Sequence, residues 1–105
     1  MANFYLDNKD LQIQFDHPLM RRIIELREGD FSACKHYDYA PQHAEDALDS
    51  YRRVMELAGE ICGEVIASNA ESVDREGPHH EGDRVRYASG TVENLKAMQA
   101  AGLDG

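Results

Sequence analysis

The sequence predicts an all-α chain organised around one long amphipathic helix, and three observations lead to this prediction. From Ala44 to Ile66 the apolar residues recur at spacings of three and one, as they do on a helix with a broad apolar face. About 25 residues at 1.5 Å each would span roughly 37 Å. Two shorter stretches, near residues 18–27 and 91–101, carry helix start and stop signals. An extended N-terminal arm and a candidate small hairpin complete the expected fold.

Composition limits the possible partners and the cellular setting. The 105 residues suffice for one small domain or for part of a larger one. The formal net charge of −9 argues against nucleic acid and membranes as partners, because both select positive surfaces. No apolar run approaches the roughly 20 residues of a membrane span, and the first residues lack a secretory pattern. Cys34 and Cys62 do not suggest a disulfide framework, so we expect a reducing, cytoplasmic setting.

Residues 1–30 are expected to form an N-terminal arm followed by a short helix. Residues 1–12 read as irregular or extended, and the alternation of Leu11, Ile13 and Phe15 with polar residues predicts a short strand. Asp16 or His17 would then cap a helix with Pro18 in its first turn. Gly29 would end that helix.

Residues 31–105 are expected to hold the long helix, the candidate hairpin and a last helix. Residues 30–42 read as an ordered loop, and the long helix should run from about Ala44 to Ala67. Gly59 and Gly63 each cost roughly 1 kcal/mol of helix propensity, so the pair favours close packing of another element over a simple bend. Ser68-Asn69 and Glu76-Gly77-Pro78 are the stop signals.

The C-terminal third predicts a hairpin and a last helix. Between residues 79 and 87, Val85 and Tyr87 alternate with arginines after a turn at Glu81-Gly82-Asp83. Ser89-Gly90-Thr91 opens the last helix, and Gly102 is its stop signal.

The residues that could carry chemistry do not assemble into a convincing site. His79, His80 and Glu81 could bind a metal, but neighbouring residues on a strand point to opposite faces. Cys34 and His36 could form a nucleophile pair, but no third group orients them, and a free thiol is the better interpretation. Two acidic clusters, at residues 45–49 and 71–76, read as solvated faces rather than acid–base pairs. We therefore predict no catalytic, cofactor-binding or metal residue in this chain.

The ordered series of residues resembles a known enzyme family. The matching stretches are Tyr37-Asp38-Tyr39-Ala40-Pro41, Glu45-Asp46-Ala47, Tyr51-Arg52-Arg53-Val54, Gly59 to Ala67, Asn69 to Asp74, Glu76-Gly77-Pro78 and Ala101-Gly102-Leu103. Together they look like the N-terminal part of a FAD-dependent acyl-CoA dehydrogenase. The chain is most similar to a long-chain bacterial subfamily that includes methylmercaptopropionyl-CoA dehydrogenase-like enzymes. In that subfamily an extra arm, similar to Asn3-Phe4-Tyr5 through Pro18-Leu19, precedes the usual first helix.

The resemblance implies a fold and a reaction for the complete enzyme. Family members combine an N-terminal helical domain, a middle β-domain and a C-terminal helical bundle. A glutamate removes the α-proton of an acyl-CoA thioester, and the β-hydrogen leaves as hydride to FAD. No residue here matches that glutamate or a flavin-contact motif, so the resemblance implies an inactive N-terminal fragment. Its partner would be the rest of the polypeptide, and FAD would bind only there.

A second hypothesis is a stand-alone helical interaction module. The broad apolar face, with Gly59 and Gly63, could bind a partner helix. Under either hypothesis two short helices would not cover that face, so we expect a homo-oligomer with long helices packed together. Whether this chain has enzyme activity as it stands, and which acyl chain length the complete enzyme prefers, are left open by the sequence.

Overall fold

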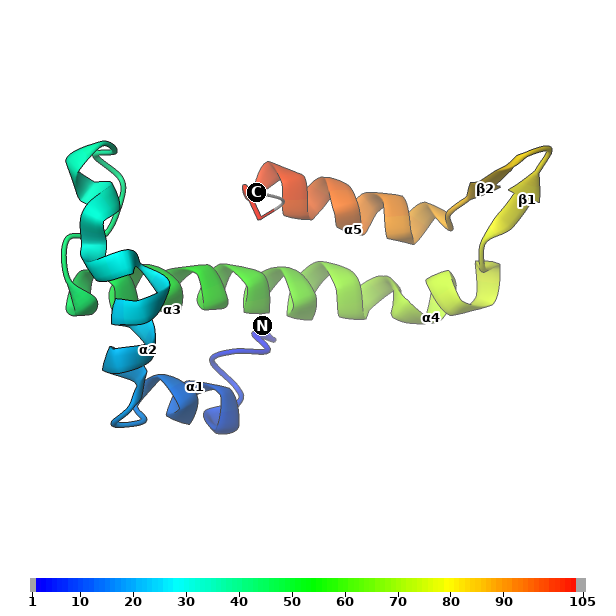
Figure 1. Ribbon diagram of the computed structural model, residues 1–105. Helices are drawn as coiled ribbons and strands as arrows, with labels where there is room; N and C mark the ends of the chain where they lie inside the picture. Colours follow the sequence, from blue (N-terminus) through cyan, green and yellow to red (C-terminus); the bar gives the residue numbers. More distant parts are fainter. Residues whose placement is uncertain (1, 104–105) are drawn as a thin grey trace.

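The computed structural model describes residues 2–103 as an elongated, mostly helical scaffold with one small hairpin (Figure 1). Its elements, in order, are α1 (Lys9–Phe15), α2 (Met20–Arg27), the 3-10 segment η1 (Gly29–Lys35), α3 (Ala44–Ile61), the π-helical segment η2 (Cys62–Ile66), α4 (Ala67–Glu76), β1 (His79–Glu81), β2 (Arg84–Arg86) and α5 (Ser89–Ala100). The expectation of a helical fold is confirmed. Met1, Asp104 and Gly105, which the sequence predictions also cover, lie outside the described residues.

The long helix is real and longer than expected, because α3, η2 and α4 form one continuous rod of 33 residues. The expected end at Ala67 is wrong. Ser68 does not stop the helix, since its hydroxyl donates to the Val65 carbonyl at 2.7 Å and stays inside the helical pattern. The second stop signal, Glu76-Gly77-Pro78, is confirmed: the rod ends at Glu76, where Gly77 has a positive φ of 65°.

The segment before residue 16 corrects another expectation. Residues 9–15 are not a strand but the helix α1, and Asn8 caps it by accepting hydrogen bonds from the amides of Asp10 and Leu11. A lone strand would have left its backbone groups without partners, whereas a short helix satisfies them internally. The aromatic ring of Phe15 then meets Tyr5 edge-on, with ring centroids 6.1 Å apart.

The start of α2 differs from the expected cap. Helix α2 begins at Met20, because His17 and Pro18 form a turn before it rather than its first turn. The His17 Nδ1 accepts a hydrogen bond from the Leu19 amide at 3.1 Å. Gly29 ends the helix as expected, with φ 55°, and Asp30 and Phe31 continue this left-handed path. The expected loop after residue 30 therefore begins as the 3-10 segment η1.

The core lies where α2 and η1 cross the first turns of α3. Ile24, Ala44 and Ala47 are buried there, and Met20, Phe31, Leu48 and Tyr51 pack around them. The small side chains of Ala44 and Ala47 let α2 approach α3 closely, and Ile24 fills the contact.

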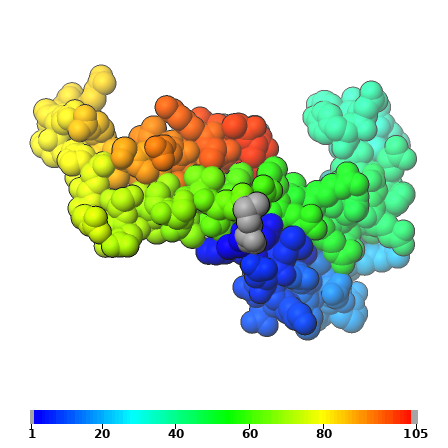
Figure 2. Space-filling view, turned by 180° about the vertical axis from the view of Figure 1, so that it is seen from behind, coloured from blue at the N-terminus to red at the C-terminus, as the bar shows by residue number. Residues whose placement is uncertain are grey.

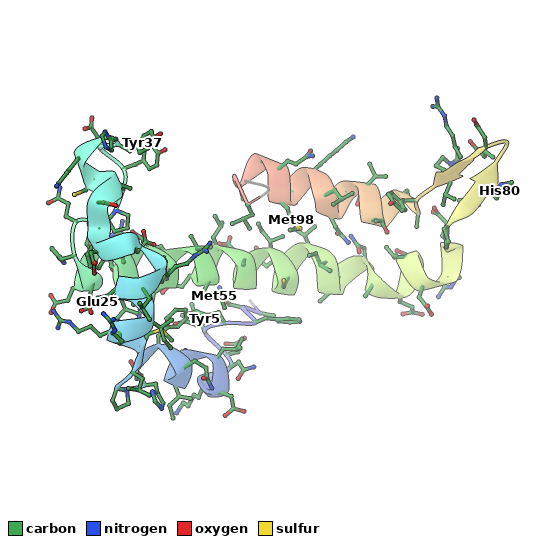
Figure 3. All side chains as sticks on the ribbon, in the orientation of Figure 1. Tyr5, Glu25, Tyr37, Met55, His80 and Met98 are labelled. Carbon is green, nitrogen blue, oxygen red and sulfur yellow. The ribbon has the colours of Figure 1, made fainter. Side chains whose placement is uncertain are left out.

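A second layer forms where α5 runs back along η2 and α4 (Figure 1). Gly90 faces Val73 and Asn69 so closely that a Cβ at this position would overlap the Val73 side chain. The amides of Asn69 and Asn94 pair reciprocally, at 2.7 and 3.2 Å. Figure 3 shows Met98 between α5 and the long helix.

The expected hairpin between residues 79 and 87 is confirmed. Strands β1 and β2 are antiparallel, with His80 opposite Val85, and Gly82 makes the turn with φ 61°. The hairpin projects beyond the end of the rod (Figure 1). Most of its side chains are exposed, so it serves as the connection that reverses the chain from α4 to α5.

Candidate functional site

The surface, rather than a cleft, is the distinctive feature of this chain. The radius of gyration is 17.7 Å, whereas a compact chain of this length is expected to have about 13 Å. The accessible surface is 8080 Å², whereas a compact monomer of this mass exposes about 5,900 Å². The excess is about 2,200 Å² by these relations. Exposed apolar side chains on α2 and α3 contribute to this surface, so the exposed faces are the first candidates for function.

One apolar face lies on the outside of α2. Its outer stripe consists of Leu19, Ile23 and Leu26, which are 64%, 54% and 65% exposed. These residues share one helical face, opposite the buried Ile24. An apolar stripe that is more than half exposed on a helix already anchored by its other side is suited to protein contact.

A second opening lies over the middle of α3. Figure 2 shows the surface hollowed between the segment around residues 30–40 and the end of α5. On α3, Val54 is 50% exposed and Leu57 is 36% exposed. Toward the start of the rod α2 covers Ala47, and farther along Ile61 is buried again. The long apolar face is thus covered at both ends and open in between.

The two glycines of the long helix receive the N-terminal strap, which we define as residues 2–7. The Asn3 side chain donates to the Glu56 carbonyl at 3.0 Å, and the Phe4 amide donates to the Gly59 carbonyl at 3.1 Å. A Cβ on Gly59 would lie 2.6 Å from the Tyr5 nitrogen, and one on Gly63 would overlap the Ala2 carbonyl. Figure 3 shows Tyr5 beside Met55 beneath the helix. The expected close approach is confirmed, although its occupant belongs to the same chain.

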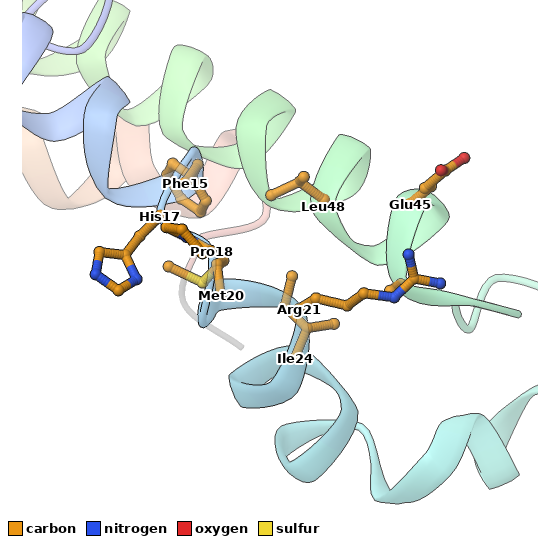
Figure 4. Close-up of a pocket in the computed structure, with 9 residues that line it drawn as sticks. Phe15, His17, Pro18, Met20, Arg21, Ile24, Glu45 and Leu48 are labelled. Carbon is orange, nitrogen blue, oxygen red and sulfur yellow. The ribbon is translucent and has the colours of Figure 1, made fainter.

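A small cavity lies between the turn before α2 and the start of α3 (Figure 4). Its volume is about 180 Å³. The wall is mainly apolar, with Phe15, Met20, Ile24 and Leu48 among its members, and Arg21 and Glu45 stand on its lining. An apolar cavity of this size suits a side chain or a ring. It does not bring together a nucleophile, a base and an orienting group.

One half-buried polar contact links the C-terminal cap of α2 to the long helix. The Tyr51 hydroxyl donates a hydrogen bond to the Glu28 carboxylate. Burial, followed by the hydrogen bond to Glu28 and its charge, raises the pKa of Tyr51 to about 12. This shift stabilises the protonated phenol, so the contact is structural at neutral pH.

A second polar contact fixes the start of α5. Glu76, at the end of the rod, accepts hydrogen bonds from the Ser89 amide at 2.8 Å and from the Ser89 hydroxyl at 3.0 Å. The Ser89 amide, then its hydroxyl, and then His79 hold the pKa of Glu76 below its ordinary value. The carboxylate therefore ties α4 to α5 across the hairpin.

The histidines and cysteines that the sequence raised as candidates are not brought together. The His79 Nε2 lies 3.5 Å from the Glu76 carboxylate, while His80 lies on the exposed hairpin (Figure 3). Within residues 2–103 no three potential ligands are grouped for a metal ion. Cys34 and Cys62 are half-buried free thiols. The backbone amide of His36 donates a hydrogen bond to the backbone carbonyl of Ala33.

The acidic clusters make capping and ion-pair contacts within the long helix. Asp46 accepts from the Gln42 amide at 3.1 Å, and His43 Nδ1 accepts from the Asp46 amide at 3.2 Å. The pair caps the start of α3, and this role of His43 is one that the sequence analysis missed. Asp49 pairs with Arg53 at 2.9 Å and Glu71 with Arg75 at 2.7 Å, all exposed. Such pairs contribute little to stability and are not a reaction site.

Comparison with known proteins adds no relative: no protein-family profile, characterised protein or solved structure matches this chain. Among the described residues, no helix combines the length and the apolar character that crossing a membrane requires.

Proposed function

We propose that this chain is the N-terminal structural part of a FAD-dependent acyl-CoA dehydrogenase and is inactive by itself. The observation that carries the proposal is the large unburied surface of the rod, which is open at Val54 and Leu57. A scaffold with covered ends and an open middle is suited to receive other helices and a β-domain, as the resemblance implies. The ordered sequence resemblance from Tyr37 to Leu103 supports the particular family.

In this proposal the chemistry belongs to the rest of the polypeptide. The complete enzyme would abstract an α-proton from an acyl-CoA thioester and pass the β-hydrogen to FAD in the cytoplasm. The present residues would position the helical domain and would contact neither FAD nor the reacting carbons. No catalytic or cofactor-binding role is proposed for any residue of this chain.

The test is to purify the native gene product and to assay the 105-residue chain beside it. We expect the native product to be a much longer yellow flavoprotein that oxidises acyl-CoA. The 105-residue chain mixed with FAD should show neither bound-flavin absorbance nor turnover. A native product of 11.8 kDa, or acyl-CoA oxidation by the short chain, would refute the proposal.

The alternative remains a stand-alone helical interaction module that self-associates through its long helix. The exposure of Val54 and Leu57 on α3 favours it. The face formed by Gly59 and Gly63 does not favour this alternative, because the N-terminal strap already occupies it. A native product of 11.8 kDa without flavin would support this alternative.

A further inference from the structure

The outer stripe of α2 is the strongest candidate for a contact with another molecule. Leu19, Ile23 and Leu26 stand at positions i, i+4 and i+7, on the side that α3 does not touch. Ile24, on the inner side, is 1% exposed, so α2 is already anchored. A helix with one buried and one open apolar face has room for a second packing partner.

The charge of α2 indicates what kind of surface would cover this stripe. The helix carries Arg21, Arg22 and Arg27 against a single Glu25, in a chain whose net charge is −9. Glu25 faces both Arg21, at 3.6 Å, and Arg22, at 3.4 Å. By helical position Arg22 and Arg27 flank the stripe on either side. A matching surface would be apolar with acidic residues at its edge.

The same chain displays such a surface beside α1. An open groove, which we call the acidic groove, lies around Phe4, Asp7, Asp10 and Leu11. Phe4 is 51% exposed and Leu11 is 39% exposed, so its apolar part is accessible. Asp7 and Asp10 supply the carboxylates, with Lys9 as the one opposing charge.

We infer that a second copy of this chain docks here, with the α2 stripe of each copy on the acidic groove of the other. A two-fold axis would use both contacts twice, as closed dimers do. The dimer thus forms through α1 and α2 rather than through packed long helices. It depends only on these surfaces and not on the enzyme family.

The first experiment measures the mass of the 105-residue chain by light scattering during gel filtration, at tens of micromolar. We expect a dimer, and we expect Ile23→Glu to convert it to a monomer with unchanged helical circular dichroism. Val85→Glu is the matched control, because Val85 is equally exposed on the hairpin, at 61% against 54% for Ile23. A monomeric parent chain, or an Ile23→Glu variant that stays dimeric, would overturn the inference.

The second experiment tests the pairing of charges. Arg22→Glu alone and Asp10→Arg alone should each raise the dissociation constant of the dimer about tenfold. This corresponds to a loss of about 1.4 kcal/mol in the free energy of dimerisation. The two changes combined in one chain should restore the dimer, because each reversed charge then meets its opposite. Failure of the combined variant to recover would overturn the pairing of these two surfaces. Dissociation by Val54→Glu but not by Ile23→Glu would instead place the contact on α3.

Discussion

At the level of single residues, two glycines decide where the N-terminal strap lies. Gly59 and Gly63 leave one side of the long helix without Cβ atoms, and the backbone of residues 2–5 fills that side. The Phe4 amide and the Asn3 side chain then bond to helix carbonyls. The two glycines lower the helix propensity of this segment, and the direct backbone contacts with the strap offset that cost.

Gly59→Ala should therefore destabilise the chain despite the better helix propensity of alanine. The added Cβ would lie 2.6 Å from the Tyr5 nitrogen, which is backbone and has little room to shift. We expect a loss of about 1–3 kcal/mol in the free energy of unfolding. In a chain without residues 2–7 the same change should instead stabilise by about 1 kcal/mol. Urea unfolding is measured for the parent chain and for Gly59→Ala, each with and without residues 2–7. A loss of the same size with and without the strap would contradict this prediction.

Tyr51 gives a second prediction, at alkaline pH. Its pKa is raised from 10.0 to about 12 in the folded chain, so the folded state favours the protonated phenol. The stabilisation is complete below pH 10 and is lost as the pH rises through about 12. Tyr51→Phe should remove this part of the alkaline loss and cost about 1 kcal/mol at neutral pH.

Thermal unfolding at neutral and alkaline pH measures both effects. The control is Tyr87→Phe, which removes the hydroxyl of an exposed tyrosine. An identical alkaline loss in the parent chain and in Tyr51→Phe would show that Tyr51 does not contribute.

Among the elements, α5 depends on a contact outside itself. Its cap residue Ala88 has no side chain that can accept a hydrogen bond, and Glu76 from the end of α4 does so instead. The carboxylate thus replaces a local cap and also fixes the direction in which the hairpin returns the chain.

Glu76→Ala should loosen the first turn of α5. The pKa of Glu76 is lowered from 4.5, so its stabilising effect is present above that value and is lost as the pH falls through the lowered folded pKa. We expect a lower protection factor for the Ser89 amide, taken relative to the intrinsic exchange rate at each pH, in the variant and in the parent chain at acid pH. Glu71→Ala, on the exposed side of α4, is the control. Unchanged exchange at Ser89 in Glu76→Ala would contradict this role.

For the whole molecule, shape matters more than any single contact. The chain extends 49 × 32 × 20 Å, and its small core is divided among the crossing of α2 with α3, the strap around Tyr5 and the layer of α5 on the rod. The open face at Val54 and Leu57 is the surface that the proposed enzyme scaffold would cover, and the outer stripe of α2 is the surface that the proposed dimer would cover.

This shape predicts a low sensitivity to denaturant. The unfolded chain would expose about 17,100 Å², so folding buries about a fifth less surface than in a compact domain of the same mass. Because the urea m value scales with this area, the dilute monomeric variant Ile23→Glu should have an m value about a fifth below the compact expectation. The dimeric parent chain should show a higher value per chain. Equal m values for the two would contradict the account.

The sequence alone determined the elements that local patterns encode. Spacings of three and one predicted the rod from Ala44, the stop signals at Gly29 and Gly102 were placed correctly, and the turn before Val85 predicted the hairpin. It also predicted that Gly59 and Gly63 receive a closely packed element. These features depend on residues within a few positions of each other, where periodicity and backbone preference decide.

Tertiary structure decided what packs on the rod, whereas its end at Glu76 follows the local stop signal Glu76-Gly77-Pro78. Nothing local to residues 2–7 indicates that they reach a helix more than fifty positions away, because such a contact depends on how the chain folds back. The same holds for the contact of Glu76 with Ser89 and for the pairing of Asn69 with Asn94. The open stripe on α2 is likewise visible only once Ile24 is seen to face the core, since a pattern of apolar residues does not reveal which of its two faces is covered.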